Sequence, residues 1–161
     1  MTTISVRYHF RQPLAAPAPA AYAWCTDFGP ADGALFSART RRTVRWIAED
    51  ALVMTDTTYP GRRPLRIQRL VRLDPEARAW TNTHLDGPYR GSQYWYRVVA
   101  DGARRSHLEF RGLRLEASAR RLSAAEVDRR SAECRRADAG EWRRRLAPAL
   151  ARDVGGRRSR E

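Results

Sequence analysis

The chain has 161 residues, the length of one domain, which is enough to bury roughly two-thirds of its unfolded surface in a single core. All 31 basic residues are arginine and outnumber 18 acidic residues, so the net charge of +13 should attract nucleic acid or anionic membranes without specificity. No run of about eighteen apolar residues and no hydrophobic signal core is present, so we expect a cytoplasmic protein without a membrane span.

The first part of the chain predicts one strand followed by two short helices. Residues 3–11 alternate between apolar and polar side chains, which is the period of a half-buried strand. The segment from Pro13 to Pro19 is rich in proline and alanine and predicts a linker. A short helix should follow over residues 20–25, and a second short helix or turn over residues 31–36.

The central part predicts six consecutive strands separated by short turn signals such as Pro60-Gly61 and Asp101-Gly102. Connections this short do not allow crossovers, so neighbouring strands should be antiparallel, with one exposed face and one covered face. The expected strands span residues 38–48, 51–59, 64–73, 77–85, 91–100 and 104–115. We assign to the exposed face the arginines Arg42, Arg66, Arg72, Arg97 and Arg111.

A long C-terminal helix is predicted from Ser123 to Val154, before a glycine pair that should end it. Ser123 and Glu126 have the spacing of a capping box, in which the hydroxyl and the carboxylate each satisfy a backbone N–H of the first turn. Pro148 lies inside the helix, where its ring removes a hydrogen bond and crowds a carbonyl of the preceding turn. We therefore expect a bend near Pro148 or a break near Gly140.

Residues 1–155 are expected to form a single domain, and residues 156–161 a disordered basic tail. Cys25 and Cys134 are far apart and have no Cys or His neighbour at metal-ligand spacing, so we interpret them as ordinary reduced thiols. The sequence also lacks a Ser/His/Asp order and a glycine-rich phosphate loop, and no cofactor or metal is expected. Nothing in the sequence indicates an oligomeric state.

This order of elements resembles the helix-grip fold of the START-like superfamily. The resemblance is carried by the alternating strand at 3–11, the Ala21-Tyr22-Ala23-Trp24 helix after its proline-rich link, and the tail from Gly140 to Leu150. It implies an α+β fold in which a curved antiparallel sheet of about seven strands, with two short helices after the first strand, wraps around a long C-terminal helix.

The resemblance also implies a cavity between sheet and helix that holds lipids, polyketides, hormones or other apolar small molecules. Within the superfamily, the polyketide cyclase/dehydrase and lipid-transport group looks most similar. The superfamily shares no single set of catalytic residues, so the resemblance assigns none to this chain.

A polar patch is predicted on the covered face of the sheet. Arg69 has the same parity as the apolar residues of its strand, and the hairpin turns, centred at 62–63 and 75–76, place it opposite Asp56 and Asn82. His84 and Tyr94 should share this face. The expected ligand-binding residues are Asp56, Arg69, Trp80, Asn82, His84, Tyr94, Tyr96, Phe110, Trp142 and Leu146.

Two interpretations of this patch remain open. Convergent polar groups in an apolar concavity orient ligands, and Arg69 would suit a carboxylate or enolate oxygen. Alternatively, the patch is a satisfied ion pair inside the sheet, because an inward arginine needs a partner whatever its role. We expect the protein to bind an apolar or aromatic small molecule, in which an acidic group can be present.

A polyketide-type cyclase or dehydratase is the alternative. His84 or Asp56 would act as general base, and Arg69 or Tyr94 would stabilise an oxyanion. His9 and His107 fall on the exposed face, so neither supports His84. A third possibility is a basic interaction module, but no nucleic-acid-binding motif accompanies the charge, and only non-specific attraction to nucleic acid is expected.

Overall fold

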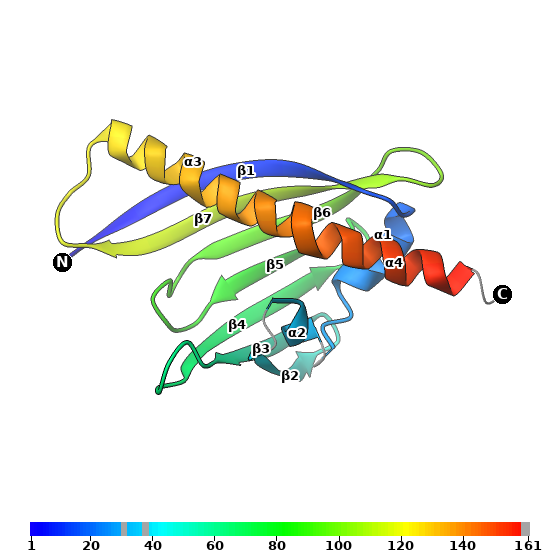
Figure 1. Ribbon diagram of the computed structural model, residues 1–161, viewed down its shortest axis with the longest axis horizontal. Helices are drawn as coiled ribbons and strands as arrows, with labels where there is room; N and C mark the ends of the chain where they lie inside the picture. Colours follow the sequence, from blue (N-terminus) through cyan, green and yellow to red (C-terminus); the bar gives the residue numbers. More distant parts are fainter. Residues whose placement is uncertain (30–31, 37–38, 159–161) are drawn as a thin grey trace.

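The computed structural model describes residues 1–29, 32–36 and 39–158. It contains one curved antiparallel sheet of seven strands in the order β1-β7-β6-β5-β4-β3-β2 (Figure 1). The expected α+β helix-grip architecture is confirmed. The strands are β1 (Thr2–Leu14), β2 (Arg41–Ala48), β3 (Ala51–Thr58), β4 (Leu65–Asp74), β5 (Ala79–His84), β6 (Gln93–Ala100) and β7 (Ser106–Ser118).

The helices cover one face and one end of this sheet. The helical elements are α1 (Ala18–Cys25), α2 (Gly33–Phe36), α3 (Ala124–Glu141), the π turn η2 (Trp142–Leu146) and α4 (Ala147–Arg158). Figure 1 shows the last three helical elements, which form the C-terminal helical segment, as one long rod across the sheet; α1 lies beside the C-terminal end of this rod, and α2 lies beside β2. Within the described part of the chain, no helix combines the length and apolar character needed to cross a bilayer.

The core lies between the sheet and the C-terminal helical segment. Along β1, Val6, Tyr8 and Phe10 are buried while the residues between them are exposed, as the period of two requires. Trp142 and Leu146 of η2 belong to the same cluster of buried side chains. The burial of these apolar side chains therefore determines which face of the sheet packs against the helix.

The capping box at the start of α3 is present as predicted. Ser123 Oγ accepts from the backbone N–H of Glu126 at 3.3 Å, and the backbone N–H of Ser123 donates to Glu126 Oε2 at 2.8 Å. The expected interruption lies between Gly140 and Pro148, as the π turn η2, in which the N–H of Ala147 bonds to the carbonyl of Trp142. Widening the turn is one way for a helix to accommodate an internal proline.

Several element boundaries differ from expectation by a few residues, and α1 begins inside the predicted linker, at Ala18. β1 continues through Pro13 to Leu14, because β1 is an edge strand and can carry a residue without an N–H. The strand expected at 38–48 begins at Arg41, and residues 37–38 lie outside the described part. The glycine pair does not end α4, which continues to Arg158; of the tail predicted to be disordered, residues 159–161 are not described.

Candidate functional site

A cavity of about 340 Å³ lies between the concave face of the sheet and the C-terminal helical segment. Every ligand-binding residue predicted from the sequence lines it except Asp56, which lies behind Arg42 and Arg69. The contact of these residues with a ligand remains a prediction. The rest of the wall includes Trp24, Cys25, Phe28, Asp32, Leu35, Arg42, Met54, Ile67, Tyr89, Arg114, Asp138 and Glu141.

The apolar part of the wall is largely aromatic. Trp80 and Tyr96 are neighbours on β5 and β6, and their rings are stacked at 4.8 Å with an interplanar angle of 1°. The ring of Phe110 on β7 meets the edge of Tyr96 at 5.1 Å. Because these rings come from adjacent strands and pack on one another, the sheet holds them in place as an apolar wall.

The predicted neighbours of Arg69 are wrong. It pairs with Met54 on β3 and His84 on β5, instead of Asp56 and Asn82. Each hairpin is centred one residue from the predicted position, which moves the partner by two residues. A shift of two preserves the face on which a side chain lies, so the predicted residues still share the concave face.

Asp56 nevertheless bonds Arg69, together with a second arginine. Arg42 donates to both carboxylate oxygens of Asp56, from Nε at 2.8 Å and from Nη2 at 2.9 Å, and Arg69 Nη1 donates to Oδ2 at 2.8 Å. Burial alone would raise the pKa of Asp56, but hydrogen bonds from Arg42 and the charge of Arg69 outweigh it and lower the pKa. The carboxylate is therefore ionised and fully engaged.

The assignment of Arg42 to the exposed face is wrong. Arg42 lies directly opposite Asp56 on β2, is only 8% exposed and lines the cavity. Parity within a strand with few apolar residues does not show which face is covered. The orientation of Arg42 is determined by Asp56, because the carboxylate of Asp56 offers the buried guanidinium a bidentate partner.

His84 is a buried neutral imidazole. Burial first, and then the positive charges of Arg69 and Arg114, lower its pKa from 6.5 to about 4. Its Nδ1 is buried without a hydrogen-bond partner among the described residues, as is Oδ1 of Asn82. The site therefore offers unused polar atoms, but His84 has too little proton affinity to be an effective base near neutral pH.

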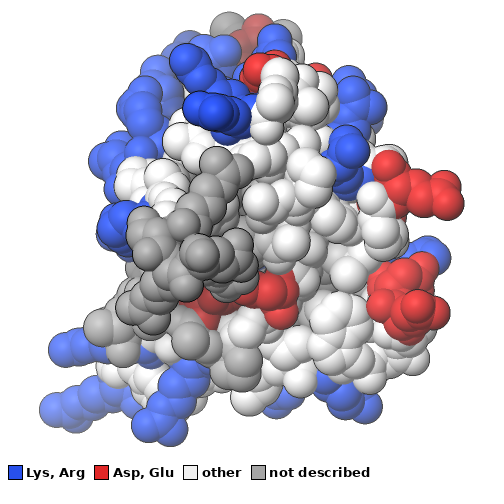
Figure 2. Space-filling view, turned by 90° about the vertical axis from the view of Figure 1, so that its right-hand side faces the viewer, with Lys and Arg blue, Asp and Glu red and all other residues white. Residues whose placement is uncertain are grey.

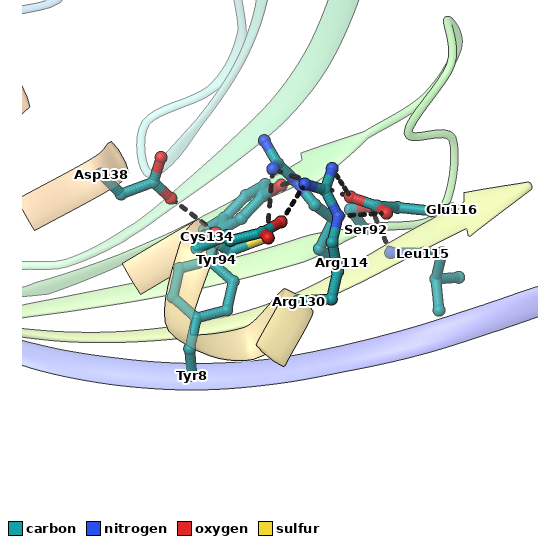
Figure 3. A network of polar contacts seen from close by, with 10 residues as sticks. Tyr8, Ser92, Tyr94, Arg114, Leu115, Glu116, Arg130, Cys134 and Asp138 are labelled. Carbon is teal, nitrogen blue, oxygen red and sulfur yellow. Dashed lines mark hydrogen bonds and ion pairs between the residues drawn. The ribbon is translucent and has the colours of Figure 1, made fainter. Parts of the chain in front are cut away.

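Sequence reasoning missed a second polar group, centred on Arg114 of β7 (Figure 3). Its guanidinium donates to the hydroxyl of Tyr94 at 3.4 Å and to Sγ of Cys134 at 3.3 Å, and lies over the ring of Tyr89 at 4.3 Å. Arg114 has the same parity as Phe110, for which the sequence predicts an inward side chain. Strand parity could therefore have found it.

Asp138 of α3 was also missed. It accepts a hydrogen bond from the hydroxyl of Tyr8 at 2.5 Å, and burial raises the pKa of both groups (Figure 3). Asp138 precedes Trp142 by four residues and so shares its helix face, which is the signal in the sequence. The contact with Tyr8 joins residues 130 positions apart, and no local pattern predicts it.

His107 lies on the outer face as expected, but it is buried there. Its Nδ1 lies 2.8 Å from Asp101 Oδ2, and the guanidinium of Arg11 also contacts the ring. His9 is exposed. No group of His, Cys, Asp and Glu side chains in the described ranges is arranged to hold a metal ion.

Comparison with known proteins shows the fold and little more. No family model and no curated protein matches the chain. Among solved structures, Zhui aromatase/cyclase from Streptomyces sp. R1128 has 16% identity and a TM-score of 0.65, over 95% of this chain and 96% of that one.

Norcoclaurine synthase from Thalictrum flavum, in complex with dopamine and hydroxybenzaldehyde, has 14% identity and a TM-score of 0.67, over 94% of this chain and 87% of that one. The di-domain ARO/CYC BexL of the BE-7585A biosynthetic pathway has 13% identity and a TM-score of 0.64, over 87% of this chain and 46% of that one. At these identities the likeness shows a shared fold alone, the helix-grip fold.

Proposed function

We propose that this helix-grip chain binds a small aromatic or apolar molecule with an acidic oxygen, in the cavity between the sheet and the C-terminal helical segment. The observation that carries the proposal is the state of Arg69. It lines an aromatic cavity and uses only Nη1 for Asp56; in the described part of the chain, no acceptor bonds its remaining nitrogens. A carboxylate or enolate oxygen would complete its hydrogen bonds.

The local charge supports an anionic ligand group. Asp56 is one carboxylate between two guanidiniums, those of Arg42 and Arg69. Arg42 also acts on Asp32, another carboxyl of the cavity wall. The charge offered to a ligand at this end is therefore that of Arg69, which bonds Asp56 through Nη1 alone. A guanidinium in a low-dielectric pocket favours an anion over a neutral group of the same shape.

The aromatic wall supports a flat ligand. The stacked Trp80 and Tyr96 rings, with Phe110 beside them, give the cavity an aromatic wall against which an aromatic ring can pack. The cavity volume lies at the lower end of the range of small-molecule sites. Dopamine and hydroxybenzaldehyde, the two molecules in the norcoclaurine synthase complex, are small aromatic compounds of this shape.

A cyclase or dehydratase is the second candidate, and the aromatase/cyclase neighbours favour it. The donors of Arg69 could stabilise an oxyanion there. The general bases proposed from the sequence do not suit the role, because Asp56 is engaged by two arginines and His84 has a depressed pKa. Asp138, a cavity carboxylate whose pKa is raised by burial, is the better base.

Matched ligands test the binding proposal. We expect 2-naphthoic acid to bind more tightly than 2-naphthylmethanol in calorimetric titrations, by about tenfold or more for a charge-assisted hydrogen bond. Arg69→Gln should abolish this preference. Arg66→Gln is the control, because Arg66 is exposed on the same strand and should leave the preference intact.

Two outcomes would contradict the proposal: equal affinity for the acid and the alcohol, or a preference that survives in Arg69→Gln. Mass spectrometry of the ligand recovered after incubation separates the two candidates. A carrier returns the ligand unchanged, whereas a dehydratase acting on a hydroxyketone returns a product lighter by one water.

A further inference from the structure

The cavity has two polar groups of opposite charge on different elements. Arg69 projects from β4, and Asp138 projects from α3, where it meets Tyr8 of β1. Both line the cavity. Since β1 and β4 are separated by β7, β6 and β5 in the sheet, the two groups lie toward opposite sides of the concave face.

Asp138 has unused acceptor capacity, just as Arg69 has unused donors. Oδ2 of Asp138 accepts from Tyr8, and no described residue donates to Oδ1. Asp138 lines the cavity, and a carboxylate oxygen there is more stable with a donor than without one. A ligand with a hydrogen-bond donor at this end would supply one.

Tyr96 lies between the two groups. After burial, the largest cause of its raised pKa, the next two influences are the negative charge of Asp138, which raises it, and the positive charge of Arg69, which lowers it. Both charges thus act on Tyr96, whose strand β6 lies between β1 and β4 in the sheet and whose ring is stacked on Trp80. The unpartnered Asn82 Oδ1 and His84 Nδ1 on β5 also lie between β4 and β6.

A neutral donor is sufficient for Asp138. The positive charge of Arg114 already acts on this carboxyl and opposes the rise in its pKa. A second cation at this position would be attracted by Asp138 but repelled by Arg114. A hydroxyl donates a hydrogen bond without this repulsion, and we take it as the matching group.

Resting on the function proposed above, we propose that the ligand is a two-ended hydroxyaromatic acid. Its carboxylate or enolate oxygen is bound by Arg69, its aromatic core packs on Trp80 and Tyr96, and a hydroxyl at the far end donates to Asp138. The cavity thus recognises the acidic oxygen, the hydroxyl and the distance between these two groups of the ligand.

Three compounds with one aromatic core test the inference: 6-hydroxy-2-naphthoic acid, 2-naphthoic acid and 2-naphthol. In calorimetric titrations of the unaltered protein, the hydroxyl should raise the affinity of the acid by about tenfold. In Asp138→Leu that gain should be lost, so that the acids with and without the hydroxyl bind with equal affinity. Asp128→Leu, an exposed position on the same helix, should retain the gain.

The result that overturns the inference is a hydroxyl that adds no affinity, or a gain that persists in Asp138→Leu. If 2-naphthoic acid still binds in an Arg69-dependent way in either case, the proposed function stands and only the two-ended ligand fails. If none of the three compounds binds, both fail.

A second variant covers the case in which Asp138→Leu does not fold. Tyr8→Phe removes the hydroxyl that occupies Oδ2 and leaves the carboxylate of Asp138 in place. It should preserve the gain from the ligand hydroxyl or increase it about threefold, while the affinity for 2-naphthoic acid stays unchanged. Loss of the gain in Tyr8→Phe overturns the inference.

Discussion

Asp56 holds two guanidiniums on the sheet side of the cavity. Its side chain is 8% exposed and that of Arg42 is 4% exposed, so this ion pair is largely shielded from water. Such a pair contributes little net stability compared with an apolar pair of the same size. The role of this ion pair is to position Arg69, which donates to the same carboxylate at the cavity wall.

Removing the carboxylate should be costly. In Asp56→Ala, Arg42 and Arg69 are left buried without their shared partner, and the free energy of unfolding should fall by about 3–5 kcal/mol. Urea denaturation measures the change. Asp50→Ala, in the exposed turn between β2 and β3, is the control, and an equal loss in both variants would contradict a structural role of the ion pair.

The depressed pKa of His84 makes stability depend on pH. The folded imidazole titrates near 4 and the unfolded one near 6.5, so between these values the unfolded chain binds a proton that the folded chain does not. This contribution is therefore present above pH 6.5 and is lost as the pH falls toward 4. Asp32, whose pKa burial raises to about 6, acts in the opposite direction.

Comparing variants isolates His84. His84→Gln should lose less stability than the unaltered protein when the pH is lowered from 7 to 5, by about 1 kcal/mol after allowance for screening by solvent. The contributions of Asp32 and of other carboxyls are common to both proteins and cancel. Denaturation midpoints that fall in parallel would show that His84 does not titrate in this way.

At the scale of elements, the C-terminal helical segment is anchored on both sides of its π turn. Toward its start, Arg130 of α3 bonds Glu116 of β7 at 2.9 Å. Toward its end, Asp153 of α4 accepts from Nε1 of Trp24 in α1 at 2.8 Å. The π turn between these anchors presents Trp142 and Leu146 to the cavity. We expect any movement that admits a ligand to occur at this turn.

Strand β7 makes room for Tyr8 through Gly112. Gly112 pairs with Tyr8 on one side and Tyr94 on the other, and a Cβ at this position would lie 2.9 Å from two ring carbons of Tyr8. Only glycine lets that ring lie over the strand and reach Asp138. The contact of Tyr8 with Asp138 of the helix therefore depends on the absence of a side chain at Gly112.

Gly112→Ala should force the ring of Tyr8 aside and lower the free energy of unfolding by about 1–3 kcal/mol. Gly61→Ala is the matched control, since a Cβ there meets nothing within 4 Å. Urea denaturation of both variants provides the measurement. If Gly112→Ala were as stable as Gly61→Ala, the close approach of Tyr8 would not be a packing constraint.

At the scale of the whole molecule, the charge is concentrated outside the cavity. Figure 2 shows basic side chains around much of the rim of one end of the molecule, acidic side chains at its right edge and near its centre, and uncharged surface between them. On the convex face of the sheet, Arg7, Arg66, Arg72 and Arg111 are exposed. A surface of this kind attracts polyanions through counterion release without reading their sequence.

We therefore expect weak, sequence-independent binding to single-stranded DNA. Fluorescence anisotropy with three oligonucleotides of unrelated sequence should give similar affinities. Each should fall by more than about tenfold between ~50 mM and ~200 mM salt. A preference for one sequence that is retained at the higher salt concentration would instead indicate a nucleic-acid site.

The sequence by itself determined the order of elements and the face of most strand residues. Period-two alternation identifies a strand's faces without knowledge of its partners. This is why Arg69, His84 and Tyr94 were placed on the concave face although the predicted partners of Arg69 were wrong. The start of α3 could likewise be predicted, because the capping box of Ser123 and Glu126 involves only residues of the first helical turn.

Only the tertiary structure decided what those residues meet. Hairpin centres depend on turn conformation, the face of Arg42 depends on the carboxylate opposite it, and the contact of Asp138 with Tyr8 depends on how the helix packs across the sheet. These are long-range interactions between segments that carry no local signal of one another. The concave face could therefore be predicted from periodicity, whereas the two-ended polar arrangement of the cavity comes from packing.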